Sequence, residues 1–276
     1  MTLILAMNAP NAICLSVDYM VTKVSDGSVV DPFAVKSLVI KTSMEPGPTM
    51  LLAYTGLAEL WGRMPMGRWL RETLRGVSQP MPELINLLVT QLNRKITSFN
   101  QPLVINFLIV GGPPGDERYF GAIGNTKDWQ TIESKFELVM NKLDQPQLFA
   151  NGSGRGSATA PKYIDLATAH VADLAHATED HMALLAKINR GVAEANPGGP
   201  VSPYCFITGL GTDTNWTPTM RVFHKSDETP PNFHMPMIVC GIDLSNPAEQ
   251  IHRAAVNRAH PTLDENQIRR NLDRRT

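Results

Sequence analysis

The chain has few cysteines, few aromatic residues and no excess of charge of one sign. Only three of its 276 residues are cysteines, and none belongs to a Cys-x-x-Cys pair, so the sequence indicates neither a disulfide framework nor a zinc site. The 25 basic and 26 acidic side chains give a net charge of -1, which removes the electrostatic basis for binding nucleic acid or an anionic membrane. We therefore expect buried thiols and no nucleic-acid or membrane partner.

Long apolar runs are missing as well. No segment approaches the roughly 18 consecutive apolar residues of a membrane span. The apolar N-terminal stretch 1–15 has no Lys or Arg with which a signal peptide would begin. The sequence thus predicts a cytoplasmic protein, and its 43% of hydrophobic residues predicts a large globular core.

Three of the seven histidines, His170, His176 and His181, fall in a segment with a helical pattern. Their spacings of six and five residues do not bring all three to one face of a helix, so no metal site is expected there. The segment 179–181 is expected to be the solvated start of a helix. Neither a metal nor an organic cofactor is predicted elsewhere.

The N-terminal part of the chain has the pattern of two β-hairpins. Apolar runs at 2–7 and 12–17 flank the turn-prone triplet Ala9-Pro10-Asn11, and runs at 37–42 and 49–55 flank a loop rich in Pro and Gly. In the first run, the residues that would point to either face of a strand are apolar, as expected for a strand that is covered on both faces. These strands should lie in the middle of a layered fold.

The hydrophobic period then changes to three and four residues, which predicts helices over about 57–76 and 82–95. Two more helices are predicted between about 164 and 194. Further strands are predicted at 103–110, 118–123, 131–140 (a strand or a short helix), 201–208, 220–224 and 237–242. We expect a main domain of residues 1–244 and a C-terminal helix and tail at 245–276.

The order of the predicted elements indicates their arrangement. Turns of a few residues join the early strands, which excludes a doubly wound parallel sheet. Strands covered on both faces, together with two pairs of amphipathic helices, are most simply accommodated by two stacked antiparallel sheets with a helix layer outside each. The expected fold class is α+β, a four-layer αββα sandwich.

The residue with the clearest chemistry is Thr2. A chain that begins Met-Thr has a small second residue of the kind from which the initiator methionine is removed. Removal leaves a threonine that has both a hydroxyl and a free α-amine. Because the amine titrates near pH ~8, it can accept the hydroxyl proton at neutral pH. Thr2 is therefore a candidate nucleophile that carries its own base.

The predicted hairpins place two charged residues near Thr2. A first turn centred on Pro10 puts Thr2 opposite Asp18. A second turn centred in the Pro/Gly loop puts Lys36 opposite Gly56. A lysine beside the hydroxyl makes its deprotonation easier, and a carboxylate keeps that lysine charged. A glycine lets a backbone N–H approach a developing oxyanion.

These segments resemble the β-type subunits of the proteasome and their bacterial relatives, which are N-terminal nucleophile hydrolases. The resemblance covers roughly residues 2–208 and is carried by Thr2-Leu-Ile-Leu-Ala, Ser16-Val-Asp18, Lys36-Ser-Leu-Val-Ile, Tyr54-Thr-Gly56-Leu-Ala and Asn151-Gly-Ser153-Gly. It implies an αββα sandwich that hydrolyses peptide or other amide bonds through an acyl-enzyme ester. It also implies assembly as a homo-oligomer, a ring or a stacked ring.

The resemblance implies a role for each matching residue. Thr2 is the expected nucleophile and base, with Lys36 and Asp18 as its electrostatic support. The Gly56 amide is the expected oxyanion donor, and Ser153 is expected near the threonine amine.

Two positions depart from the pattern of this family. The family usually has an arginine two residues after the acid, where this chain has Met20. It also has an aspartate followed three residues later by a serine and Gly-Gly, where this chain has Glu194 and Pro197. Glu194 can act as an acceptor and is a candidate site residue, but proline offers neither a hydroxyl nor an N–H. An alternative function is therefore a catalytically silent assembly subunit of the same fold.

A second alternative is a phosphate site in the Gly-rich segment 151–157. Consecutive backbone N–H groups at the start of a helix attract anions. The segment lacks the Lys-Ser/Thr of a P-loop, however, and no βαβ unit surrounds it. The sequence therefore disfavours nucleotide binding.

Overall fold

The structure of the chain is a computed structural model. It describes residues 2–19, 21–22, 29–31, 34, 36–43, 47–60, 64–95, 101–111, 117–126, 131–171, 173, 175–199, 201–223 and 237–244. The expected C-terminal extension 245–276 lies outside the described residues, as do Met1 and Met20, so the division of the chain at residue 244 stays a prediction.

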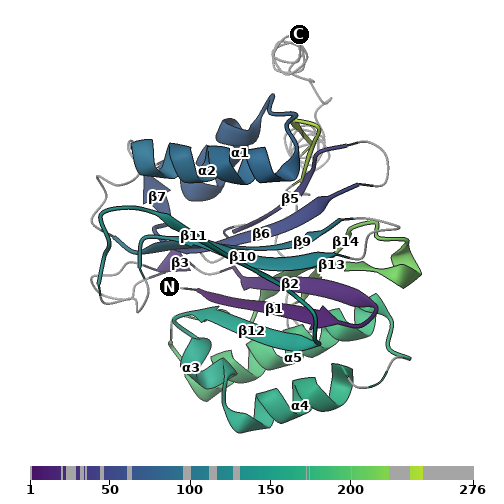
Figure 1. Cartoon of the computed structure of the whole chain (residues 1–276). Helices are drawn as coiled ribbons and strands as arrows, with labels where there is room; N and C mark the ends of the chain where they lie inside the picture. The colour runs from purple at the N-terminus through teal and green to yellow at the C-terminus, as the bar shows by residue number, and fades with distance from the viewer. Residues whose placement is uncertain are drawn as a thin grey trace, which may run out of the picture.

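One sheet has five antiparallel strands in the order β12-β1-β2-β13-β14 (Figure 1). β1, β2 and β13 are buried along their whole length, because the sheet is covered on both faces. The strands span Leu3–Ala9 (β1), Ala12–Asp18 (β2), Gln147–Gly152 (β12), Cys205–Gly211 (β13) and Thr219–Phe223 (β14).

The second sheet has seven strands in the order β11-β10-β9-β6-β5-β15-β16. Its pairs are antiparallel except that β15 runs parallel to β5, which no hairpin joins to it. The strands span Ser37–Lys41 (β5), Thr49–Gly56 (β6), Leu103–Val110 (β9), Arg118–Gly124 (β10), Glu137–Lys142 (β11), Met237–Val239 (β15) and Ile242–Asp243 (β16). Two small ribbons pair β3 (Val21–Thr22) with β4 (Val29–Asp31), and β7 (Glu59–Leu60) with β8 (Met64–Pro65).

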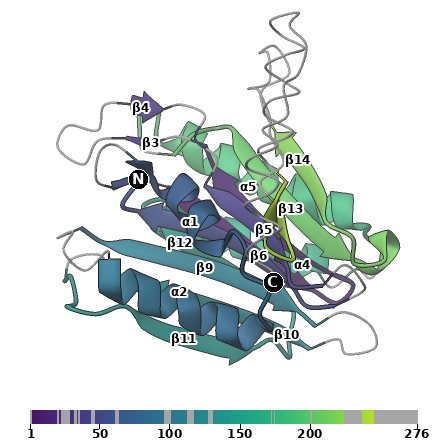
Figure 2. The same cartoon turned by 90° about the horizontal axis from the view of Figure 1, so that it is seen from above.

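Helices cover the outer face of each sheet (Figures 1 and 2). α1 (Met66–Leu74) and α2 (Met81–Lys95) lie on the seven-stranded sheet. α3 (Arg155–Ala158), α4 (Pro161–Val171) and α5 (Thr178–Ala195) lie on the five-stranded sheet, and a short 3₁₀ turn spans Thr212–Thr214. In the described part of the chain, no helix has the length and apolar character needed to cross a bilayer.

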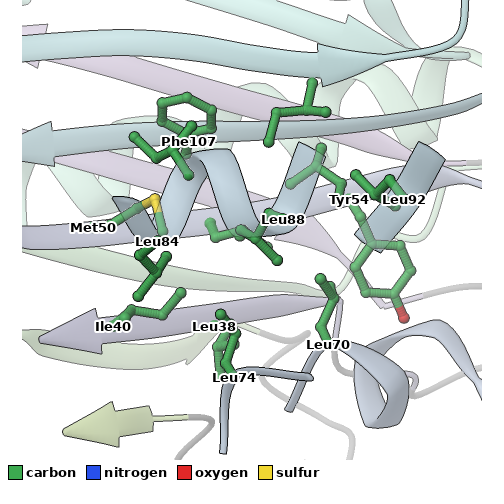
Figure 3. Close-up of a cluster of buried hydrophobic side chains, with 14 of the residues drawn as sticks. Leu38, Ile40, Met50, Tyr54, Leu70, Leu74, Leu84, Leu88, Leu92 and Phe107 are labelled. Carbon is green, nitrogen blue, oxygen red and sulfur yellow. The ribbon is translucent and has the colours of Figure 1, made fainter. Parts of the chain in front are cut away.

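Three separate hydrophobic layers hold the four structural layers together. The first lies between α1, α2 and the seven-stranded sheet, the second between the two sheets, and the third between the five-stranded sheet and α4 and α5. In the first layer, leucines spaced four residues apart on α2 pack towards β5, β6 and β9 (Figure 3). The predicted αββα sandwich is confirmed.

The element predictions fail before α1 and around β11 and β12, and the strand predicted at 237–242 is divided into β15 and β16. The segment before α1 forms β7 and β8, and α1 begins only after Pro65, since a proline lacks the N–H needed inside a helix. The predicted helix over 57–76 is therefore wrong in its first half. The segment 131–140, predicted as a strand or a short helix, is a strand that begins only at Glu137. β12 is not predicted, because its half-exposed edge position leaves no continuous apolar pattern.

Both predicted hairpin registers are wrong. In the first hairpin Ala9 pairs with Ala12, so the turn has two residues and Asp18 is in register with Leu3 rather than Thr2. In the second hairpin the pairing is centred one residue before Pro46. Lys36 therefore lies opposite Tyr54, whose N–H donates to the Lys36 carbonyl at 3.1 Å.

The rings of His170, His176 and His181 are in contact, although their spacing in the sequence predicts that they do not share one face of a helix. The rings of His170 and His176 stack with centroids 3.8 Å apart, and His181 meets them edge-on at 5.0 and 6.1 Å. The prediction assumed one helix, but His170 lies near the end of α4 and His181 in the first turn of α5. His181 is also buried rather than solvated, and its Nε2 lies 3.0 Å from Oδ1 of Asn11 in the β1–β2 turn.

This position makes His181 hard to protonate. Because the Asn11 amide oxygen accepts from Nε2, the buried Nδ1 carries the lone pair, and among the described residues it has no hydrogen-bond partner. Burial, followed by the neighbouring rings of His170 and His176, lowers the pKa of His181 to about 4. Asp180 and Asp213 oppose this shift only in part.

We therefore expect the free energy of unfolding to decrease as the pH falls from about 6.5 towards 4. In this window the unfolded chain binds a proton at His181 and the folded chain does not, which destabilises the folded state by about 2 kcal/mol at pH 5. Urea unfolding at pH 7.5, 6 and 5 measures the slope. The control is His181→Gln, which keeps an amide donor for Asn11 but does not titrate. Equal slopes in the two proteins would contradict the assignment.

Candidate active site

Thr2 lies at the start of β1, beside the end of β12, and is only 3% exposed. Its carbonyl accepts a hydrogen bond from the Ser153 N–H at 2.9 Å, and its own N–H donates to Ser153 Oγ at 3.1 Å. The bend after β12 requires glycine at position 152, where φ is +89° and a Cβ would lie 1.9 Å from the Thr2 carbonyl oxygen. The Gly-rich segment therefore allows a close backbone approach that brings Ser153 to Thr2.

Lys36 reaches Thr2 from the residue before β5. Its Nζ donates to Thr2 Oγ1 at 2.6 Å and to Asp18 Oδ1 at 3.2 Å. The side chains of Lys36 and Asp18 are 2% and 0% exposed, so the ion pair is buried. The structure thus brings together four predicted site residues, Thr2, Asp18, Lys36 and Ser153, from β1, β2 and the ends of β5 and β12.

Backbone N–H groups surround the Asp18 carboxylate. Leu3 N donates to Oδ1 at 3.0 Å, and Ser202 N donates to Oδ2 at 3.1 Å. Burial raises the pKa of Asp18, whereas the Lys36 ammonium and the two N–H donors lower it and oppose that rise. A buried ion pair is tolerated only when hydrogen bonds replace the lost water, and both carboxylate oxygens meet this condition.

This arrangement favours ionisation of the Thr2 hydroxyl. A positive charge within hydrogen-bond distance stabilises an alkoxide at Oγ1 more than it stabilises the neutral alcohol. Asp18 keeps the lysine charged and fixes its direction. The low exposure of Thr2 and Lys36 strengthens the effect, since little water screens the charge.

Gly56 lies at the end of β6, where it pairs with Leu103. Its φ of +97° and a Cβ position 2.0 Å from the Pro102 carbonyl oxygen require glycine there, independently of any catalytic role. The preceding residue, Thr55, lies near the Thr2 region, because its Oγ1 would be 3.2 Å from a Cβ on Gly152. The role of the Gly56 amide as an oxyanion donor stays a prediction.

The structure does not bring Glu194 to this cluster. Glu194 lies in the last turn of α5 and is exposed, as are Asn196 and Pro197 after it. In the part of the chain that the structure describes, no hydrogen bond or ion pair joins Glu194 to Thr2, Lys36 or Ser153. The altered segment therefore supplies none of the observed support of Thr2.

The Gly-rich segment is occupied by contacts within the chain. The N–H of Gly152 donates to the Asn151 side chain, and that of Ser153 donates to Thr2. α3 has only four residues, and β12 before it is antiparallel to β1. These contacts argue against a phosphate cradle at 151–157.

Two residues that matter for the site were missed. Ser202, which follows α5, gives Asp18 a hydrogen bond, and Asn189 on α5 donates to the Ser202 carbonyl at 2.8 Å. Ser202 contributes only backbone atoms near Asp18, so no side-chain pattern reveals it. Asn189 did leave a signal, because it is a polar amide on the apolar face of an alanine-rich helix.

No metal centre is formed by the described ranges, in which no three His, Cys, Asp or Glu side chains are arranged to hold an ion. His170 and His176 stack in parallel, which prevents their ring nitrogens from converging on one ion. The three cysteines are free and buried, as predicted.

Comparison with known proteins supports the fold. The structure is similar to an Anbu (Gly-1) mutant from Hyphomicrobium sp. strain MC1, at 12% identity over 95% of this chain and 100% of that one, with a TM-score of 0.51. It is also similar to the helical assembly of the Anbu complex from Pseudomonas aeruginosa, at 9% identity over 82% and 88% of the two chains, with a TM-score of 0.50. Eukaryotic HslV from Trypanosoma brucei has 13% identity over 76% and 99%, with a TM-score of 0.43. No family model and no curated protein matches the sequence. The two Anbu structures therefore support the layered sandwich fold described above.

Proposed function

We propose that this chain is an N-terminal threonine hydrolase that cleaves peptide or other amide bonds in the cytoplasm. The observation that carries the proposal is the 2.6 Å contact between Lys36 Nζ and Thr2 Oγ1, with Asp18 behind the lysine at 3.2 Å. The proposal requires Thr2 to become the first residue, so that its α-amine is free.

The first half of the proposed reaction forms an ester. The α-amine takes the proton from Oγ1, while the Lys36 ammonium stabilises the oxygen as it becomes negative. Oγ1 attacks the carbonyl carbon of the amide, and the π electrons move to the carbonyl oxygen. The oxyanion is stabilised by the Gly56 N–H. When the tetrahedral intermediate collapses, the C–N bond breaks and the protonated α-amine gives its proton to the leaving nitrogen.

The second half hydrolyses the ester. A water molecule gives a proton to the α-amine and attacks the acyl carbon, and the same oxyanion site stabilises the second intermediate. Its collapse breaks the bond to Oγ1, which takes back the proton. Ser153 supports this cycle from the other side, because its Oγ lies 3.1 Å from the nitrogen of Thr2.

The proposal includes a homo-oligomeric, proteasome-like assembly. The Pseudomonas aeruginosa Anbu structure is described as a helical assembly. In this chain, β11 offers a suitable surface, because it is an edge strand whose Leu138, Val139 and Met140 are 37%, 58% and 45% exposed.

The alternative function is a catalytically silent assembly subunit. The observation that favours it is the exposed position of Glu194 and Pro197, away from Thr2. In this reading, the Lys36–Asp18 pair only stabilises the N-terminal end of β1.

Covalent labelling tests the two functions against each other. We expect a peptide β-lactone to acylate the purified protein once per chain, with the added mass mapping to Thr2. A peptide epoxyketone should label the same residue, because it offers a ketone to the hydroxyl and an epoxide to the adjacent amine. Intact mass spectrometry before labelling shows whether the chain begins at Thr2.

A chain that begins at Thr2 and reacts with neither probe would support the silent subunit. Labelling by the lactone alone would indicate a reactive hydroxyl without a free amine, which contradicts the proposed base. An adduct on another residue would disprove Thr2 as the nucleophile.

A further inference from the structure

The orientation of Asp18 depends on a segment that belongs to no strand. Oδ1 of its carboxylate accepts from Leu3 N and from Lys36, whereas Oδ2 accepts from Ser202 N at 3.1 Å. β13 begins only at Cys205, so no regular ladder holds Ser202 in place. Other contacts must therefore fix the donor of the second hydrogen bond.

Asn189 supplies the contact that joins this segment to a helix. Its Nδ2 donates to the Ser202 carbonyl at 2.8 Å in a fully buried environment. Tyr204 on the same segment adds two local contacts, since its N–H donates to Ser202 Oγ at 3.1 Å and its carbonyl accepts from Tyr19 N at 3.3 Å. Asn189 is thus the side chain that ties Ser202 to α5, 13 residues away in sequence.

Packing alone does not explain why an amide side chain occupies position 189. Asn189 is 0% exposed, between Leu185 and Val192 on the buried face of α5. Its Oδ1 has no hydrogen-bond partner among the described residues. A half-satisfied amide costs more in an apolar layer than a leucine of similar size. The cost is explained if the amide holds the Ser202 carbonyl in place.

We infer that Asn189 is a positioning residue for the proposed hydrolase: it fixes Ser202, which orients the Asp18 carboxylate that holds Lys36 against Thr2. The inference rests on the proposed function. It assigns no contact between Asn189 and a substrate. It predicts instead that a change on α5 alters the ionisation of Asp18 and Lys36, neither of which Asn189 is seen to contact.

The test is Asn189→Leu, which keeps the approximate volume and removes the donor. We expect the rate constant for labelling by the β-lactone at saturation to fall by about tenfold, with little change in the half-saturation concentration. The acid limb of the pH–rate profile should move to higher pH. The reason is that the Ser202 N–H lowers the pKa of Asp18, and a displaced Ser202 lowers it less.

In the described part of the chain, the charged and titratable groups near Asp18 include Lys36, the Thr2 amine once it is free, and the Cys205 thiol, beside which Arg190 lies. Burial raises the pKa of Cys205 to about 12, so the thiol does not titrate in this range. A shift of the acid limb therefore reports on Asp18 and the two amines.

The matched control is Asn93→Leu on α2. Asn93 also donates from a helix to a backbone carbonyl, that of Phe136 at 3.0 Å, but it lies on the other helix layer. It should lower the unfolding midpoint without moving the pH profile. A second variant, Asn189→Gln, keeps an amide donor and should recover part of the rate and of the acid limb, which also covers the case that Asn189→Leu does not fold.

Different failures have different meanings. Wild-type protein that begins at Thr2 and is not labelled would overturn the proposed function and, with it, the positioning role. If the wild type is labelled, an Asn189→Leu profile identical to the wild-type profile would overturn the inference alone, and so would an Asn189→Gln profile displaced as far as that of Asn189→Leu. A shift of equal size in Asn93→Leu would do the same, because it would show a general effect of lost stability.

Discussion

Replacing Thr2 with valine should reduce hydrolysis of peptide amides by at least about a thousandfold, because it removes the group that is proposed to form the ester. Valine has the shape of threonine without the hydroxyl, so the buried position of Thr2 stays filled. Lys36 loses the acceptor that it contacts at 2.6 Å but keeps Asp18. The measurement is steady-state hydrolysis of fluorogenic peptide amides, with lactone labelling as a second readout.

The control for this variant is Thr2→Ser, which keeps the hydroxyl and should retain a substantial part of the activity. Serine and valine are both small second residues, and intact mass should show whether Met1 has been removed in each protein. Urea unfolding should give similar midpoints for all three proteins. A valine variant that hydrolyses as fast as the wild type would show that Thr2 is not the nucleophile.

The fold could be predicted because burial repeats regularly in the sequence. β1 is apolar at both parities, and α2 has leucines four residues apart, so each pattern predicts both an element and the faces that it buries. The segment 57–65 has apolar residues at helical spacing too, yet it forms β7 and β8. There the proline before α1 and the pairing of β7 with β8 outweigh a helical periodicity that covers few residues and is interrupted.

The site was found although both strand registers were wrong. The first register is off by one residue, an error that moves every side chain within a ladder to the opposite face, whereas the second pairs Lys36 with Tyr54 instead of Gly56 and is off by two. Thr2 precedes the first paired residue of β1, and Lys36 precedes the first paired residue of β5, so neither side chain is bound to that alternation. The lysine is also long enough to span the difference. The prediction therefore depended on which strand ends meet, and hardly on the pairing between them.

Contacts between elements that are distant in sequence could not be predicted. The Ser202 N–H donates to Asp18 across 184 residues of chain, and Asn189 supports Asp18 only indirectly, through the carbonyl of Ser202 13 residues away. The histidine cluster forms because His170 near the end of α4 meets His181 in the first turn of α5, a contact that no single-helix pattern encodes. For Asn189 and the histidines the sequence shows the polar residue but not the partner that it meets, and for Ser202 it shows neither.

The buried ion pair between Lys36 and Asp18 makes Lys36 important for stability as well as for the proposed catalysis. Asp18 is fully buried, and the Lys36 ammonium is the cation that its carboxylate contacts at 3.2 Å. Removing one partner of such a pair leaves an uncompensated charge, which typically costs about 3–5 kcal/mol. A variant at Lys36 thus affects folding and catalysis together, and an experiment has to separate the two.

Replacing Lys36 with methionine should abolish hydrolysis at every pH while its cost in stability depends on pH. Without the ammonium, the pKa of Asp18 rises further above its value in the unfolded chain, because the cation that lowers it is gone. A group with a raised folded-state pKa stabilises the fold at low pH and loses that contribution as the pH rises. The unfolding deficit relative to the wild type should therefore be about 3 kcal/mol at pH 8 and shrink as the pH falls. Lys36→Arg, which keeps the charge, should retain most of the stability but little activity, since a planar guanidinium cannot place a compact charge on Oγ1. A methionine variant that is fully active, or a deficit that does not change with pH, would show that Lys36 is not the counter-ion of Asp18 beside a reactive Thr2.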